Sequence, residues 1–289
     1  MSLLQVILLA IVQGLAELLP VSSSAHVVVA EKLMGLDPSS PPMTLLLVML
    51  HTGTMGAVIV HFWRKWRTIY FRDRATFMEV AGKIVLATML TGVIGEAIIK
   101  VIEKTAFHGV KGAQVEDLFS HLEIIAPALA AAGVLILIAG LAATTKPAGV
   151  TSESSVLSAR QAVLIGAVQG LCLPFRGFSR SGATISTGML AGVSKSTAEA
   201  FSFALAVVLT PAVVAREALR LVHATSTGDR VSMLGAFAPS LLGAIFAFLA
   251  GLLALQWLSR WLEGGRWYLF GVYCMLAAAV VFLLQLRGY

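Results

Sequence analysis

The sequence predicts an all-α polytopic membrane protein, and three observations lead to that fold class. The 289 residues are 58% hydrophobic and only 12% charged, whereas soluble domains carry about 25% charged residues. Several apolar runs reach roughly 20 residues, the length of a helix that crosses the hydrocarbon core. The runs are continuous and do not alternate with polar residues, which favours helices over a membrane barrel.

Six apolar segments are expected to span the membrane. They cover residues 43–62, 80–102, 122–144, 199–222, 236–258 and 267–286. After the first of them, residues 64–74 contain five basic residues and one acidic residue, which indicates a cytoplasmic loop. The net charge of +6 has the same explanation, so no nucleic-acid partner is expected. Cys172 and Cys274 lie in apolar surroundings and predict no disulfide.

Two polar stretches interrupt the apolar pattern and are related to each other. Residues 13–26 read QGLAELLPVSSSAH, and residues 169–183 read QGLCLPFRGFSRSGA. The tetrapeptide Val-Gln-Gly-Leu occurs at 12–15 and again at 168–171, an offset of 156, which becomes 157 after one extra residue. Irregular backbone survives in a membrane only where it is buried in protein or lines a cavity. Re-entrant helix–loop–helix hairpins are therefore expected over 1–40 and 161–195.

The chain is interpreted as one membrane domain, residues 1–289, built from two repeats. Residues 1–145 and 146–289 would each hold one hairpin and three spans. Because three is odd, the second repeat is inverted, and the two hairpins enter from opposite faces. Both termini then lie outside the cytoplasm, and the N-terminus, which has no basic region or cleavage site, is expected to belong to the mature protein.

The first polar stretch supplies groups that can attack. Gln13 and Glu17 are four residues apart and share one face of a helix. The Glu17 carboxylate either binds a divalent metal, activates a nucleophile, or is a structural group bonded to loop amides. Pro20 predicts a helix break. The serines after it provide a nucleophile and oxyanion contacts, and at least one of them is expected only to cap the next helix. They are Ser22, Ser23 and Ser24.

His26 and the second stretch complete the candidate site. His26 lies within one helical turn of the serines, where it acts as a base, an acid, a nucleophile or merely a satisfied buried donor. Arg180 stands between two serines at the expected start of a helix, an arrangement that binds phosphate. Arg176 is either a second phosphate contact or a structural arginine. One loop attacks and the other neutralises charge, as phosphoryl transfer requires, and a lipid phosphate with its tail in the bilayer would suit such a site.

These residues match two family signatures. QGLAELLPVSSSAH resembles the first signature of the undecaprenyl-diphosphate phosphatase family, membrane enzymes linked to bacitracin resistance. That signature has Glu or Gln, three residues, Glu, and then a Pro-x-Ser-Ser segment that ends in His. RGFSRSGAT at 176–184 resembles the second, Pro-Gly-x-Ser-Arg-Ser-Gly-x-Thr. The resemblance runs the length of the chain and includes Phe62, Trp63 and Arg64.

The resemblance implies a function and a set of roles. It implies hydrolysis of undecaprenyl diphosphate to undecaprenyl phosphate at the outer face of the bacterial inner membrane, which recycles the carrier for cell-wall synthesis. The site would open to the periplasm and use a divalent cation, Mg²⁺ or Ca²⁺, with Glu17 as ligand. The catalytic candidates carried over by position are Glu17, Ser23, His26 and Arg180. The substrate-binding candidates are Gln13, Ser22, Ser24, Arg176, Ser179, Ser181 and Thr184.

Three departures and one alternative accompany this interpretation. Gln13 stands at the first acidic position, Ala25 replaces the usual Gly before His, and Arg176-Gly177 replaces Pro-Gly. Beyond the lipid substrate and bilayer lipid, a homodimer is the candidate assembly. The alternative function is a lipid-phosphate flippase or anion transporter, because inverted repeats with facing hairpins are a transporter architecture.

Overall fold

The computed structural model describes residues 1–38, 40–106, 121–145, 156–224, 227–262 and 266–288. These residues form ten helices, with no strand among them. In chain order they are α1 (Leu3–Leu18), α2 (Ser23–Leu33), α3 (Pro41–Ile69), α4 (Arg74–Ala106), α5 (Leu122–Thr145), α6 (Ala159–Cys172), α7 (Arg180–Leu190), α8 (Lys195–Ala224), α9 (Thr227–Leu262) and α10 (Tyr268–Leu286).

Both predicted hairpins are present, as α1–α2 and α6–α7, and they begin in the same way. Ser2 and Gln5 form a capping box at the start of α1, and Ser158 and Gln161 form one at the start of α6. Such a box satisfies two backbone N–H groups at a helix start. The two boxes are 156 residues apart, the same offset that relates the two polar stretches. The repeat therefore extends to the residues that cap the first helix of each hairpin.

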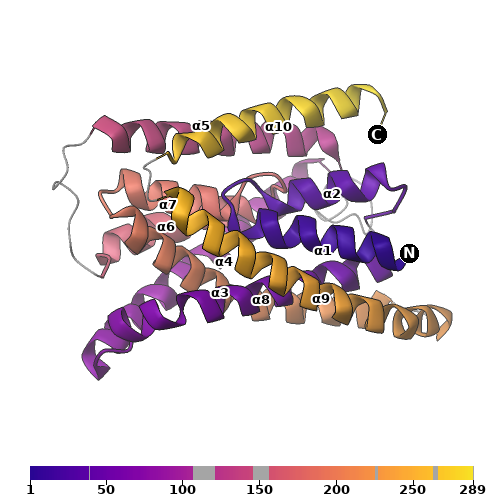
Figure 1. Ribbon diagram of the computed structural model, residues 1–289, viewed down its shortest axis with the longest axis horizontal. Helices are drawn as coiled ribbons and strands as arrows, with labels where there is room; N and C mark the ends of the chain where they lie inside the picture. The colour runs from indigo at the N-terminus through magenta and orange to yellow at the C-terminus, as the bar shows by residue number, and fades with distance from the viewer. Residues whose placement is uncertain (39, 107–120, 146–155, 225–226, 263–265, 289) are drawn as a thin grey trace.

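The two hairpins approach from opposite ends of the helical bundle. Figure 1 shows α1 beginning at the end where both termini lie, whereas α6 begins at the other end. Gly35 follows α2 with φ of 67° and Gly192 follows α7 with φ of 85°, a left-handed conformation that favours glycine. The inverted arrangement and the shared side of the two termini agree with the prediction.

Each hairpin packs against a long helix of the other repeat. A Cβ on Gly14 of α1 would lie 2.8 Å from the carbonyl oxygen of Ala247 in α9. A Cβ on Gly170 of α6, the equivalent glycine, would lie 3.1 Å from the carbonyl oxygen of Thr91 in α4. Small residues allow helix backbones to approach this closely in membranes, so the two repeats are interlocked and do not lie side by side.

Five helices are long and apolar enough to cross a membrane. Within the described residues they are Pro42–Ile69, Arg74–Thr105, Leu122–Thr144, Phe237–Trp257 and Tyr268–Leu286. The sixth predicted span, 199–222, lies within α8, a 30-residue helix whose first turns carry Lys195 and Glu199. The protein is thus a multi-pass, all-α membrane protein, as predicted.

The loop predicted over residues 64–74 is shorter in the structure than the sequence suggested. Residues 64–74 were expected to be a loop, but α3 continues to Ile69 and α4 begins at Arg74. Arg and Lys are good helix formers and can extend their charged ends to the interface, so the basic residues do not end the helix. Residues 107–120 and 146–155, which include the start of the second repeat at 146, lie outside the described residues.

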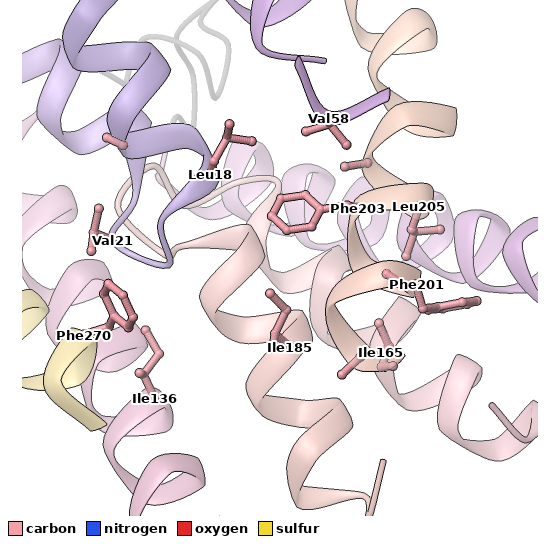
Figure 2. Packing of buried hydrophobic residues seen from close by; sticks show 14 of the residues in the cluster. Leu18, Val21, Val58, Ile136, Ile165, Ile185, Phe201, Phe203, Leu205 and Phe270 are labelled. Carbon is pink, nitrogen blue, oxygen red and sulfur yellow. The ribbon is translucent and has the colours of Figure 1, made fainter. Parts of the chain in front are cut away.

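The hairpins meet beside the main apolar core. Figure 2 shows Leu18 and Val21 of the first hairpin with Ile185 of α7 and Phe203 of α8. Ile136 of α5 belongs to the same cluster. Because both hairpins and helices from both repeats contribute to it, this core fixes the two polar turns against each other.

Candidate active site

The first hairpin turn is a helix break with one strained residue. Leu19, before Pro20, is extended with φ of −80° and ψ of 148°, as expected for a residue that precedes proline. Ser22 has φ of 67° and is the one non-glycine residue with positive φ in the described chain. Helix α2 then begins at Ser23. Side chains seldom adopt this backbone, and when they do the residue often lies at a functional site.

The Glu17 carboxylate is the centre of the site. It is 7% exposed, and Ser23 Oγ donates a short hydrogen bond to its Oε2. Gln13 Nε2 donates to the same oxygen at 3.0 Å. His51 Nε2 of α3 lies 3.6 Å from it. Gln13 and Glu17 share one helix face, as predicted, and the buried Glu17 carboxylate accepts hydrogen bonds from both Gln13 and Ser23.

The second hairpin supplies a cation to the same carboxylate. Arg180, the first residue of α7, donates through Nη2 to Glu17 Oε1. Its helix starts here because Ser179 Oγ accepts from Gly182 N at 3.2 Å, which caps the first turn. The ion pair balances the charge of Glu17, which would be costly to bury alone.

The two turns also touch directly. Ser181 Oγ donates to the carbonyl oxygen of Leu19 at 3.2 Å, and a Cβ on Gly182 would lie 3.1 Å from the carbonyl oxygen of Pro20. On the other side, Gly177 has φ of 104°, and a Cβ there would lie 2.5 Å from the carbonyl oxygen of Ile125 in α5. Glycine is required at this point, so the Arg176-Gly177 departure keeps the residue that the geometry needs.

Some predicted residues are structural or point elsewhere. Thr184 is fully buried and bonds Ser202 of α8 at 2.5 Å, so it holds α7 against α8. The charge of Arg176 acts on the buried carboxylate of Glu31 in α2.

The serines of the first turn differ in what they do. Ser22 occupies the N-cap position of α2, but its side chain makes no capping bond. Its Oγ lies 3.4 Å from Ser24 Oγ, and Ser23 bonds Glu17. The expectation that one of these serines caps α2 was wrong, because the left-handed backbone at Ser22 differs from the extended conformation that a capping residue adopts.

His26 is bonded away from the serine hydroxyls. Its Nδ1 lies 2.7 Å from the carbonyl oxygen of Ser22, and its Nε2 lies 2.7 Å from the hydroxyl of Tyr273 in α10. Both ring nitrogens are therefore engaged without a bond to Ser23. Among the three catalytic roles proposed for His26, none is visible in this arrangement.

Sequence reasoning missed His51 and Tyr273. His51 lies inside the first spanning segment, and an ionisable residue at such a position is a functional signal by itself. Tyr273 gave no comparable signal, because a tyrosine in an apolar span is usual. Only the folded chain shows that it bonds His26, 247 residues away.

The site can deprotonate a hydroxyl and bind an anion. A carboxylate that accepts from Ser23 Oγ is placed as a general base, and a guanidinium at a helix start is placed for phosphate. For a metal, no group of three or more His, Cys, Asp or Glu side chains occurs in the described residues. Available oxygens are those of Glu17 and the buried Oε1 of Gln13, which has no hydrogen-bond partner.

Fold and site together define a multi-pass membrane protein with a carboxylate–serine–arginine centre between two inverted hairpins. Comparison with known proteins identifies its family. The sequence model of the bacitracin resistance protein BacA family matches residues 6–280, and the chain belongs to this family.

Similar proteins cover nearly the whole chain. It is 55% identical over 287 residues to an undecaprenyl-diphosphatase 2 of Acinetobacter baylyi, covering 98% of both chains. It is 34% identical over 290 residues to an undecaprenyl-diphosphatase of Rhodopirellula baltica, covering 99% of both. An undecaprenyl-diphosphatase of Desulfosudis oleivorans is 33% identical over 299 residues, covering 99% of this chain and all of that one.

Proposed function

We propose that this protein hydrolyses undecaprenyl diphosphate to undecaprenyl phosphate and inorganic phosphate. Its family and the names of its relatives support that reaction. The structural observation that carries the proposal is the carboxylate of Glu17, which binds Ser23 on one oxygen and Arg180 on the other. A transporter without hydrolysis is not favoured, because it gives no reason to hold a serine hydroxyl against a buried carboxylate.

The geometry suggests an order of events. The diphosphate competes with Glu17 for the guanidinium of Arg180, since both are anions that a forked donor can bind. Glu17 then accepts the proton of Ser23 Oγ, which attacks the terminal phosphorus. The bond from that phosphorus to the bridging oxygen breaks, and undecaprenyl phosphate leaves with the proton that Glu17 took from Ser23, so that Glu17 is a carboxylate again. Water activated by Glu17 hydrolyses the phosphoserine, which releases phosphate and restores Ser23.

A divalent cation fits this site when the diphosphate is present. Mg²⁺ is often held by one or two carboxylates together with substrate phosphates. Glu17 supplies one carboxylate, and Gln13 Oε1, which is fully buried and without a partner, is a suitable second oxygen. When bound, the cation would neutralise phosphate charge. Glu17 Oε1 becomes available to it once Arg180 has moved to the diphosphate.

The proposal includes a location. We place the protein in the bacterial inner membrane, with the site open to the periplasm and the prenyl tail in the bilayer. The basic segment 64–74 favours the cytoplasm for the α3–α4 turn. A reporter fused to the C-terminus tests this, because a cytoplasmic C-terminus would reverse the assignment. Crosslinking in the membrane tests the homodimer, the candidate assembly.

Phosphate release in detergent is the decisive assay. Purified protein should release phosphate from a long-chain prenyl diphosphate without two membrane compartments, which a transporter alone would not do. Glu17→Ala and Arg180→Ala should each lower kcat/KM by about 1,000-fold. Arg287→Ala, which removes an exposed arginine near the C-terminus, should not. Full activity in either site variant would disprove these roles.

Trapping identifies the group that attacks. With substrate labelled at its terminal phosphate, rapid acid quench should leave label on Ser23. Label on His26 would identify the imidazole as the nucleophile, and label on no residue would identify water. Either result would replace Ser23 in that role and leave the overall reaction unchanged.

A further inference from the structure

The strained turn at Ser22 is held by hydrogen bonds to the Ser22 carbonyl oxygen. The Ser22 carbonyl oxygen accepts from His26 Nδ1 at 2.7 Å and from the His26 backbone N–H at 3.4 Å. Residues in sparsely populated backbone regions persist when surrounding contacts hold them there. The contacts of the Ser22 carbonyl therefore help to place the next residue, Ser23, whose hydroxyl bonds Glu17.

The tautomer of His26 follows from its partners. A carbonyl oxygen only accepts hydrogen bonds, so Nδ1 must carry a proton in order to bond Ser22. In the neutral ring Nε2 is then an acceptor, and the Tyr273 hydroxyl, 2.7 Å away, is the donor that fits it. The rings of His26 and Tyr273 also stack, with centroids 5.7 Å apart and planes at 11°.

Helix α10 holds the turn at a second point. Cys274, the residue after Tyr273, donates from Sγ to the carbonyl oxygen of Pro20 at 3.5 Å. The two adjacent residues of α10 thus contact the first hairpin at Pro20 and His26, one on each side of the reactive serines. Because α10 belongs to the second repeat, the first hairpin depends on the other half of the molecule for its geometry.

We propose that Tyr273 is a positioning residue for the phosphatase reaction. By donating to His26 Nε2 it keeps the imidazole proton on Nδ1, and the Nδ1–H bond holds the Ser22 carbonyl and directs Ser23 toward Glu17. His26 then acts as a hydrogen-bond bridge between Tyr273 and the turn and does not transfer a proton to the substrate. The inference rests on the proposed function for its kinetic consequence and on the two 2.7 Å contacts for its structural one.

Tyr273→Phe tests the bridge, because it keeps the stacked ring and removes only the hydroxyl. We expect kcat to fall by about 100-fold while KM stays within about twofold, as for a small misplacement of a reacting group. Tyr268→Phe removes the same atom from the same helix and should leave both constants unchanged. Wild-type kcat in Tyr273→Phe would overturn the proposal.

Substitution of His26 separates a bridge from an acid or base. Asn places its amide donor where Nδ1–H lies, whereas Gln places it nearer to Nε2. His26→Asn should therefore retain at least about tenfold more activity than His26→Gln, and Tyr273→Phe should add little in the His26→Asn background. Equal loss in both His26 variants would show that a titrating ring is needed and would overturn the bridge.

Histidine ¹⁵N spectra give a readout that does not depend on activity. In protein labelled at histidine, the His26 signals, assigned by their loss in His26→Asn, should show the Nδ1–H tautomer. Tyr273→Phe should shift them toward the other tautomer, and an unchanged tautomer would refute the role of Tyr273. If wild-type protein released no phosphate, the proposed reaction would fail, while these spectra would still decide whether Tyr273 sets the tautomer.

Discussion

Arg180 donates to Oε1 of Glu17, although 163 positions separate the two residues in the chain. The contact joins the start of α7 to the end of α1 and so joins the two hairpins at their turns. Ser23 and Gln13 bond the other oxygen of the same carboxylate. In the proposed reaction, a diphosphate that accepts from Nη2 of Arg180 displaces Glu17, which would link substrate binding to release of the carboxylate.

The serines of the first turn should not be equivalent. Ser23→Ala removes the hydroxyl that bonds Glu17 and should lower kcat by about 1,000-fold or more. Ser24→Ala removes a hydroxyl that lies near Ser22 Oγ, and its kcat should stay within about tenfold of the wild-type value. Phosphate release at saturating substrate measures both. Similar losses in the two variants would show that Ser23 has no special place.

A second carboxylate should strengthen cation binding. Gln13→Glu places a negative group beside Glu17 and next to the unpartnered position of Gln13 Oε1. The Mg²⁺ concentration for half-maximal activity should fall by about tenfold, because affinity rises with the charge of the ligands.

Thermal unfolding of the same variant provides an independent check on the cation. In EDTA the variant should unfold at a lower temperature than wild type, since two buried carboxylates repel each other, and Mg²⁺ should remove this difference. Gln285→Glu, near the C-terminal end of α10, is the control for added charge. An unchanged Mg²⁺ requirement would argue against a cation held by Gln13 and Glu17.

The contact between α3 and α9 should depend on a glycine. A Cβ on Gly53 would overlap the carbonyl oxygen of Ala244, whereas a Cβ on Gly82 of α4 meets nothing within 4 Å. Gly53→Ala should therefore cost about 1–3 kcal/mol, and Gly82→Ala should be neutral or stabilising by up to about 1 kcal/mol. Unfolding in detergent compares them, and equal stability would mean that α9 can shift without cost.

The start of α4 should loosen in acid. Hydrogen bonds from the backbone and side chain of Thr76, and one from Arg72, lower the pKa of Asp73 to about 2 from an ordinary 3.8. A carboxyl with a depressed pKa stabilises the fold above its unfolded value, and that stabilisation is lost as pH falls through the folded value. Hydrogen exchange in the first turn of α4 should therefore rise, relative to its intrinsic rate, between about pH 4 and pH 2.

Two variants separate charge from capping at this position. Asp73→Asn keeps an N-cap acceptor and should remove the pH dependence, whereas Asp73→Ala should expose the turn at every pH. If the wild-type turn were equally protected at pH 5 and pH 2, the carboxylate would not be what holds it.

Local sequence was enough to predict the elements of the site. Pro20 marks the helix break, and Ser179 before Arg180 marks a helix start, because each depends only on neighbouring backbone groups. The repeat related the two stretches, with Ser23 and Arg180 at the offset of 157, and predicted that one loop supplies attacking groups while the other neutralises charge. In the structure both bond Glu17.

The sequence by itself determined an all-α membrane protein with two inverted polar hairpins, since hydropathy, helix breaks and a repeat can all be recognised from the order of residues along the chain. Tertiary structure decided which polar groups meet. It let the charge of Arg176 act on Glu31 and brought His51 Nε2 to 3.6 Å from Glu17. It also joined His26 to Tyr273. The Tyr273 partner of His26 and the Cys274 contact with Pro20 come from a helix far away in the chain, because a side chain's hydrogen bonds depend on what packing brings within about 3 Å.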